Sequence, residues 1–289
     1  MYKTAVITDE ISQDLRIAAG LAKAYGLDGL EIRSVKEKNP FQMERQDFID
    51  VKNIADEFGL SICGIGTPLF KCDMDDAAQV HEHMEQLRRM TDVCALWNTK
   101  IIRGFTFWRS KSRDEVPFER IAENFQPAAD IAKDAGITVV LESEPACCVH
   151  DIRDQVKILD LIGSPNVAAL YDPGNDIAAH AAQPPYPDGY NMLRQYIRHV
   201  HLKDIKRSET GMEPALLGQG DVDFYGIFDA LKSDGYDGFV SVETHFRIKA
   251  KMDDGLLVRP QGSGFSEGGY EATEKYFQIL RDCYHWKEK

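Results

Sequence analysis

The sequence has no long hydrophobic run. None of its apolar stretches approaches the roughly 20 residues of a membrane-spanning helix, so we expect no membrane partner. The first residues, Met1–Ile7, already have the pattern of a strand, and we therefore expect no signal peptide. The 289 residues are 43% hydrophobic and 28% charged, which is typical of a soluble globular protein.

Positive charge is scarce. The 34 Lys and Arg residues are outnumbered by 47 Asp and Glu residues, which gives a formal net charge of −13. Affinity for nucleic acids rests largely on contacts of Lys and Arg with phosphates, so an acidic chain is a poor general binder of polyanions. We therefore predict no nucleic-acid partner.

Cysteine pairs of the C-x-x-C kind are absent, and the cysteines do not have the spacing of a disulfide framework. Reduced thiols are the usual state in a cytoplasm, and we predict that location. The cysteines are Cys63, Cys72, Cys94, Cys147, Cys148 and Cys283.

A G-x-G-x-x-G motif after the first strand is also absent, which argues against the main alternative fold, a doubly wound open sheet. The chain instead alternates short apolar runs with amphipathic stretches of helical spacing, at intervals of roughly 30 residues. This pattern predicts an α/β fold with a single (β/α)₈ TIM barrel over residues 1–289. The predicted strands are Thr4–Thr8, Gly29–Arg33, Ser61–Ile65, Lys100–Phe105, Ile137–Glu142, Val167–Asp172, Arg198–Leu202 and Phe239–Glu243.

The ends of several predicted helices carry recognisable signals. Gly59 and Gly136 follow helical stretches and are predicted to terminate them, while Ser12 is the expected N-cap of the first helix. Residues 246–268, after the last predicted strand, form the longest irregular stretch. We interpret it as either a lid or substrate loop, or a solvated insertion.

Four of the later strands end in a residue that can bind a metal ion: Glu142, Asp172, His201 and Glu243. Side chains alternate along a strand, and the neighbours on the opposite face are apolar, as expected under covering helices. The four polar ends are therefore predicted to point into the barrel, where its carboxyl mouth brings them together. The alternative is that each is a capping carboxylate or a hydrogen-bonded core histidine.

Three carboxylates and one imidazole form a hard, oxygen-rich ligand set. Such a set suits Mn²⁺, Mg²⁺ or Co²⁺ in six coordination, with two positions left for substrate oxygens, and it also tolerates Zn²⁺. We predict one divalent ion, with Mn²⁺ as the first choice.

The motifs around these residues resemble the xylose isomerase-like TIM barrels, the sugar phosphate isomerase/epimerase group related to endonuclease IV. The similar segments are Val200-His201-Leu202-Lys203-Asp204, Leu170-Tyr171-Asp172-Pro173-Gly174-Asn175, the loop Leu217–Phe224 and the last strand Val240–Glu243. The resemblance implies that Glu142, Asp172, His201 and Glu243 bind the ion. It also implies that Glu142 and Glu243 are an acid/base pair on opposite faces of the substrate.

A divalent ion that chelates a carbonyl and a neighbouring hydroxyl stabilises an enediolate, and two carboxylates can remove and return the proton. The predicted function is therefore a metal-dependent isomerase or epimerase acting on a free or phosphorylated keto-sugar, a small-molecule carbohydrate. The main alternative is a dehydratase or lyase similar to inosose dehydratases or C-glycoside-cleaving enzymes. Less favoured are an endonuclease IV-like DNA repair enzyme, because the early strand ends lack histidine, and a sugar-binding barrel without catalysis.

Other residues near the strand ends are weaker candidates for substrate contacts, and each has a structural alternative such as an ion pair, a turn or a solvated loop. They are Arg207, Lys203, Asn175, Trp108, Arg109 and His150. Relatives in the resembling family often pair, so a homo-oligomer is a further expectation.

Overall fold

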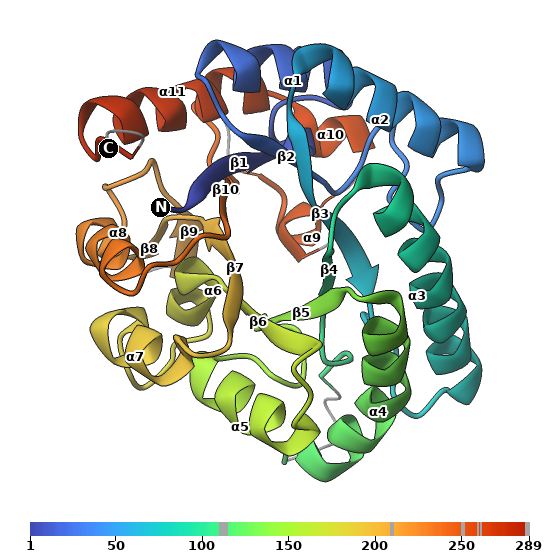
Figure 1. Cartoon of the computed structure of the whole chain (residues 1–289). Coiled ribbons are helices and arrows are strands. Elements are labelled where there is room, and N and C mark those ends of the chain that lie inside the picture. Colours follow the sequence, from blue (N-terminus) through green and yellow to red (C-terminus); the bar gives the residue numbers. More distant parts are fainter. Residues whose placement is uncertain (110–114, 209–210, 250–251, 259, 261, 287–289) are drawn as a thin grey trace.

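Eight parallel strands form a closed barrel in the order β1-β10-β7-β6-β5-β4-β3-β2, surrounded by helices (Figure 1). The computed structural model describes residues 1–109, 115–208, 211–249, 252–258, 260 and 262–286. The predicted (β/α)₈ fold is therefore confirmed. The barrel strands are β1 (Lys3–Ile7), β2 (Gly29–Ile32), β3 (Ser61–Leu69), β4 (Ile101–Gly104), β5 (Thr138–Glu142), β6 (Val167–Tyr171), β7 (Ile197–Leu202) and β10 (Phe239–Val242).

Each of the eight predicted strands occurs, with ends that differ by a few residues; β3 runs on to Leu69. The hairpin of β8 (Ile205–Ser208) and β9 (Gly211–Pro214) was not predicted. Each strand has only four residues and carries only one or two apolar side chains, Ile205 on β8 and Met212 and Pro214 on β9, which is too short an alternation to identify a strand.

The helices that pack around the barrel follow their strands in sequence. They are α1 (Leu15–Ala24), α2 (Arg45–Phe58), α3 (Ala77–Trp97), α4 (Phe118–Ala135), α5 (Ile152–Ile162), α6 (Pro173–Ala178), α7 (Tyr190–Leu193), α8 (Phe224–Ser233) and α11 (Gly269–Asp282), with short turns at Thr8–Glu10 and Pro185–Gly189.

The helix-end signals are mostly confirmed. Gly59 and Gly136 adopt the left-handed conformation and end α2 and α4, as predicted. The prediction of Ser12 as the first cap was wrong, because the N-cap is Asp14, whose carboxylate accepts the N–H of Arg16. The hydroxyl of Ser12 instead accepts the N–H of Asp14, so it shapes the turn before the helix.

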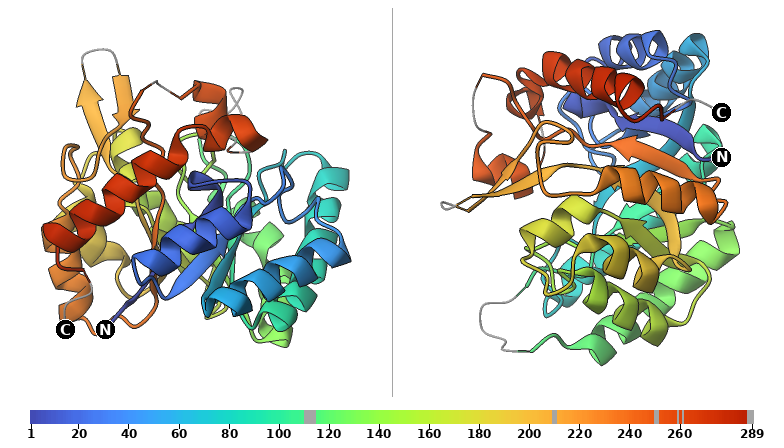
Figure 2. Two further views of the ribbon diagram at one scale, coloured as in Figure 1. Left: turned by 90° about the horizontal axis from the view of Figure 1, so that it is seen from above. Right: turned by 90° about the vertical axis from the view of Figure 1, so that its left-hand side faces the viewer.

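The stretch 246–268 contains two short helices, α9 (Asp254–Val258) and α10 (Gly262–Ser266); residues 250–251, 259 and 261 lie outside the described residues. Figure 2 shows these helices and the β8–β9 hairpin at one end of the barrel, with both termini at the other end. They therefore lie over the carboxyl end, where the predicted ligands end their strands.

Side chains separate into an inner and an outer set, as the alternation along the strands predicted. Val140, Ala168 and Leu170 form a small cluster of their own inside the barrel, with Ile101 packed against it. Leu141, Ala169, Val200 and other residues of opposite parity belong to the large cluster under the helices. Burial of one such side chain stabilises the fold by roughly 1.5–3 kcal/mol.

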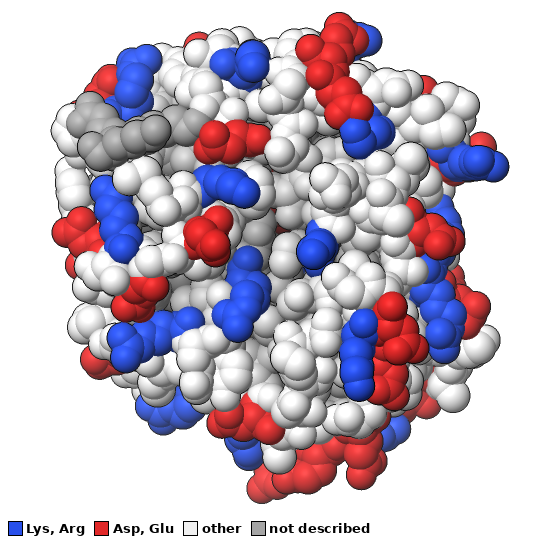
Figure 3. All heavy atoms as spheres, in the orientation of Figure 1, with Lys and Arg blue, Asp and Glu red and all other residues white. Residues whose placement is uncertain are grey.

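The surface shows no separation of charge on the face drawn in Figure 3, where acidic and basic side chains intermingle among the described residues. Within the described part of the chain, none of the helices has the length and hydropathy required to cross a bilayer.

Candidate metal centre at the carboxyl end of the barrel

The four predicted ligands converge. Glu142 ends β5, Asp172 and Glu243 directly follow β6 and β10, and His201 lies in β7. Each offers one ligand atom, and these atoms all lie within 4.8 Å of one another. The four residues are 0–3% exposed, so their polar groups face one another rather than bulk water.

Three of the four residues present a buried atom without a hydrogen-bond partner: Glu142 Oε2, Asp172 Oδ2 and His201 Nδ1. These atoms lack hydrogen bonds, although Lys203 Nζ lies 2.7 Å from Asp172 Oδ2 and Arg103 lies 3.3 Å from Glu142 Oε2. Converged oxygen and imidazole donors are the ligand types that a divalent cation takes. The residues present therefore suit the predicted metal.

The remaining atoms of Glu142 and Asp172 are held by local structure. Asp172 Oδ1 accepts the N–H of Asn175 at 3.0 Å, which makes Asp172 the N-cap of α6 and directs Oδ2 away from the helix. The side-chain amide of Asn175 donates to Glu142 Oε1 at 2.9 Å and to the carbonyl oxygen of Ser143 at 3.0 Å. The side chain of Asn175 thus orients Glu142, and its backbone N–H orients Asp172.

Glu243 is held by two cations. Lys203 Nζ lies 2.7 Å from Glu243 Oε2 and 2.7 Å from Asp172 Oδ2, although the second contact lacks hydrogen-bond geometry. Arg33 donates to Glu243 Oε1 at 2.7 Å, and its other nitrogens bond Asp9 and Glu10. The predicted base therefore lies in a buried network that favours its ionised form.

The network separates the pKa values of the carboxyl groups. Burial pushes the pKa of Glu243 up, but the charges of Lys203, His245 and His201 hold it well below its usual range. Burial raises the pKa of Asp172 to about 6, because Lys203 offsets only part of the desolvation and the neighbouring carboxylates add to it. Glu243 is therefore the stronger candidate for a group that is always ionised.

A cavity of about 430 Å³ opens beside this cluster. Of the six weaker substrate candidates, Asn175 and Lys203 line it. The other four are not among its lining residues. Trp108 is half-buried and its ring faces Lys71, Arg109 is exposed, His150 lies 3.3 Å from Asp154, and Arg207 is exposed on β8. Whether these four contact substrate stays a prediction.

The cavity wall also contains residues that the sequence did not single out. Arg103, on the inner face of β4, lies 3.3 Å from Glu142 Oε2. Lys71 pairs with Glu144 and donates to the carbonyl oxygen of Val258 at 3.1 Å. The sequence offered one signal for these residues, because Arg103 is a charged residue inside an otherwise apolar strand. The apolar wall comes from Phe105, Pro145, Ala146, Ala178, Ile205, Met212, Pro214, Leu257, Val258 and Pro260.

A second carboxylate–histidine group lies deeper in the barrel. Glu31 of β2 contacts both His199 and His201 of β7. A third group, Glu10 with Glu243 and His245, has the spacing of a metal site. Arg33 bonds both Glu10 and Glu243, so hydrogen bonds within the protein already satisfy these two carboxylates.

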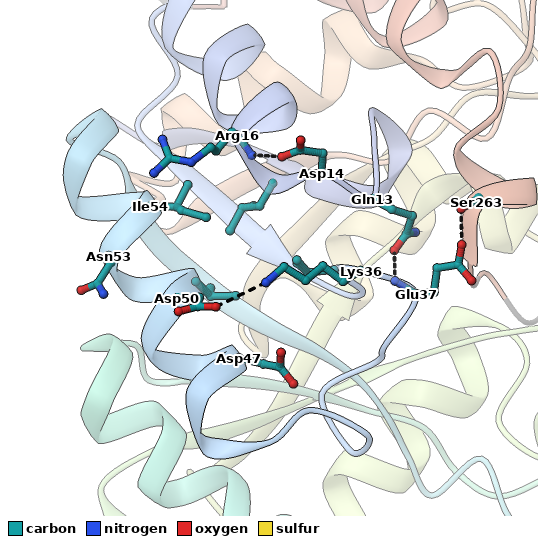
Figure 4. Close-up of a pocket in the computed structure, with 13 residues that line it drawn as sticks. Gln13, Asp14, Arg16, Lys36, Glu37, Asp47, Asp50, Asn53, Ile54 and Ser263 are labelled. Carbon is teal, nitrogen blue, oxygen red and sulfur yellow. Dashed lines mark hydrogen bonds and ion pairs between the residues drawn. The ribbon is translucent and has the colours of Figure 1, made fainter.

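A larger hollow, about 770 Å³, is a groove between α1 and α2 and contains none of the predicted site residues. Figure 4 shows its wall, where Lys36 pairs with Asp50 and the backbone N–H of Glu37 donates to Gln13 Oε1. These groups come from helices and loops rather than strand ends, and they are already paired.

Comparison with known proteins identifies relatives of this chain. The model of the family described as xylose isomerase-like TIM barrel matches residues 19–259. An inosose dehydratase of Clostridium perfringens is 26% identical over 148 residues, covering 45% of this chain and 48% of that protein. The chain thus spans about half the length of that relative in the match. An inosose isomerase of Bacillus velezensis is 22% identical over 248 residues, covering 83% and 85%.

Solved structures show the same fold at low identity. D-allulose 3-epimerase from Methylomonas sp., in complex with D-allulose, has a TM-score of 0.70 and 22% identity, with 96% of each chain covered. The probable 3-DHS dehydratase AsbF from Bacillus anthracis has a TM-score of 0.74 and 17% identity, covering 97% of this chain and 99% of that one. The IOLI protein with a bound zinc atom has a TM-score of 0.71 and 17% identity, with 96% of each covered.

Proposed function

Because the chain belongs to the xylose isomerase-like TIM barrel family, we propose that it is a divalent-metal-dependent enzyme that enolises a keto-sugar or keto-polyol. The observation that carries the proposal is the convergence of Glu142, Asp172, His201 and Glu243, three of which have a buried atom that makes no hydrogen bond. A bound ion would be held by these four residues and would supply Lewis-acid polarisation of the substrate carbonyl.

We assign the base to Glu243 and the acid to Glu142. Glu243 is kept ionised by Lys203 and Arg33, so it is able to take a proton from the carbon next to the carbonyl. Glu142 is bonded by the neutral amide of Asn175 and, at the longer distance of 3.3 Å, by Arg103. It lies on a different strand and is the group proposed to return the proton.

Isomerisation or epimerisation is the first candidate reaction. Proton return to the opposite face of the same carbon inverts it, and proton return to the former carbonyl carbon moves the ketone. Dehydration is the second candidate, favoured by the similarity to inosose dehydratases. In that case the β-hydroxyl leaves with a proton as water, and the carbon–carbon double bond remains in the product.

The charges in the cavity favour a substrate without phosphate or carboxylate. Each Lys and Arg side chain among the described lining residues already has a carboxylate partner: Lys71 with Glu144, Arg103 with Glu142, and Lys203 with Asp172 and Glu243. The described lining therefore offers an anionic group no cationic side chain that is not already beside a carboxylate, and an uncharged polyol is the first candidate substrate.

The apolar part of the cavity wall suits the carbon face of such a polyol. Phe105 and Pro145 lie on the barrel side, and Leu257, Val258 and Pro260 come from the stretch 246–268. Lys71 ties that stretch to the barrel through the carbonyl oxygen of Val258. We propose that this stretch excludes water from the reacting carbon.

The test is solvent deuterium exchange with metal-loaded protein and a panel of ketones: D-allulose, an inosose, 3-dehydroshikimate and a ketose phosphate. We expect deuterium in an uncharged ketone and loss of exchange after chelation, with recovery on adding Mn²⁺. A stereoisomer of equal mass identifies an epimerase or isomerase, and a product lighter by one water identifies a dehydratase. Binding without exchange would contradict catalysis, and robust cleavage of abasic DNA would contradict the substrate class. The cytoplasmic location and a homo-oligomer stay predictions.

A further inference from the structure

A buried carboxylate crosses the interior of the barrel below the candidate metal centre. Glu31 lies in β2, whereas His199 and His201 lie in β7, and β1 and β10 separate these strands on the shorter side of the barrel. All three residues are at most 1% exposed. Their contact therefore depends on the closed barrel and not on neighbouring strands.

The hydrogen bonds within this group are directional. His199 Nε2 lies 2.8 Å from Glu31 Oε2, and His201 Nε2 lies 3.1 Å from both carboxylate oxygens. An ionised carboxylate only accepts hydrogen bonds, so each ring nitrogen that faces it carries the hydrogen. In a neutral His201 ring, the lone pair is then on Nδ1.

Nδ1 of His201 is the atom that faces the candidate metal centre. It lies 3.5 Å from Glu243 Oε2 and 3.9 Å from Glu142 Oε1, and it has no hydrogen-bond partner. The opposite tautomer would place a lone pair against the Glu31 carboxylate and a hydrogen toward the metal position. Glu31 therefore disfavours the tautomer with its hydrogen on Nδ1, and so favours the one whose Nδ1 is able to bind a metal.

The same three residues also have the spacing of a metal site of their own. Their contacts argue for another role, because Nε2 of each histidine is already bonded to the carboxylate. A cation among them would break these bonds and leave two buried imidazoles to be rearranged. Within the group, the two histidines and the carboxylate satisfy one another's hydrogen bonds, and Nδ1 of His201 faces out of the group without a hydrogen bond. A metal-binding histidine and the residue that orients it have this arrangement.

We propose that Glu31 is a positioning residue that makes Nδ1 of His201 a metal-binding atom, with His199 holding the carboxylate from its other side. The inference rests on the proposed function, since it takes His201 as a ligand. Partners of this kind change metal affinity by about 10–100-fold when they are removed.

The first experiment is calorimetric titration of metal-free protein with MnCl₂, comparing wild type with Glu31→Gln. The glutamine keeps the size of the side chain but donates through its amide, so it either reverses the tautomer of His201 or leaves one histidine without an acceptor. We expect Kd to rise by about 10–100-fold. The matched control is Asp28→Asn, a carboxylate just before the same strand that bonds Thr4 at the opposite end of the barrel. We expect its Kd to stay within about twofold of wild type, because it contacts no proposed ligand.

The second experiment reads the tautomer directly in wild type, so it does not depend on whether a variant folds. Long-range proton–nitrogen correlation spectra of ¹⁵N-histidine-labelled protein loaded with Zn²⁺ should show His201 protonated at Nε2, with the signal assigned by a His199→Gln variant. A His201 protonated at Nδ1 in the zinc-loaded protein contradicts Nδ1 as the ligand atom, and with it the proposed ligand set. An unchanged Kd in Glu31→Gln overturns the role of Glu31 alone. Failure of wild type to bind any divalent ion overturns the proposed function as well.

Discussion

Two of the hollows of this molecule differ in size and in chemistry, and the smaller one has more of the groups that a metal site requires. The groove between α1 and α2 measures about 770 Å³, and the cavity at the carboxyl end of the barrel measures about 430 Å³. The smaller one is lined by Glu142 and Glu243, two of the four convergent residues. Volume alone therefore does not identify the site, whereas the burial and convergence of titratable groups does.

The physical difference is the environment of the charges. In the groove, the Lys36–Asp50 pair has side chains that are 61% and 38% exposed, and such pairs contribute little to stability. In the cavity, Glu243 and Glu142 are buried, and Glu142 Oε2 has no hydrogen bond, although Arg103 lies 3.3 Å away. Water screens the first set of charges, so only the second has a reason to bind an ion tightly.

The largest expected difference between the two hollows is in catalysis. Glu243→Gln should lower the rate of solvent deuterium exchange by about 10²–10⁴-fold, because the proposed base loses its charge. The matched variant in the groove, Asp50→Asn, should retain a rate within about twofold of wild type. Full activity of Glu243→Gln would remove the acid/base assignment, and a large loss in Asp50→Asn would show that the groove takes part.

The second difference is in stability. Leu170→Ala opens a hole in the inner layer beneath the ligands and should lower the free energy of unfolding by about 2–5 kcal/mol. Ile54→Ala, in the half-buried wall of the groove, should cost less, about 1 kcal/mol, because less apolar area leaves water there. Urea denaturation followed by circular dichroism measures both values. Equal losses would mean that the inner layer is not the better packed region.

The smallest difference is in the pH dependence of stability. Burial raises the pKa of Asp176 to about 7, and the backbone hydrogen bond from Ile152 offsets only part of the shift. The unfolded chain releases this proton first, so wild type should lose stability as the pH rises from about 4 to 7 and then level off.

Asp176→Asn removes that loss. Relative to wild type, the free energy of unfolding of metal-free Asp176→Asn should therefore rise by on the order of 1–3 kcal/mol between pH 4 and pH 8. The pH dependence of stability expected from Asp50, in the groove, has the opposite sign. Its pKa is lowered by hydrogen bonds from Gln46 and Lys36, so any contribution is present above its unfolded pKa and is lost at lower pH. Urea denaturation at pH 4 to 8 checks both; parallel curves for Asp176→Asn and wild type would contradict the assignment of Asp176.

Much of the site was predictable because it lies on strand ends. Glu142, Asp172, His201 and Glu243 follow apolar runs whose alternation shows which way they point, and parallel strands in a barrel share one carboxyl mouth. Arg33 was harder to place, because its bond to Glu243 joins residues 210 positions apart in the sequence. No local pattern reports such a contact.

The sequence by itself determined the eight strands, the glycine-terminated helices and the four inward candidate ligands, since each depends on local spacing and side-chain alternation. Only the tertiary structure decided which atoms of those candidates make no hydrogen bond and which cations hold Glu243. It also decided that Glu31 reaches His201 across the barrel, and that the stretch 246–268 contributes to the cavity wall. The physical reason is that burial and hydrogen-bond direction depend on where distant segments pack, and a one-dimensional pattern does not contain that distance.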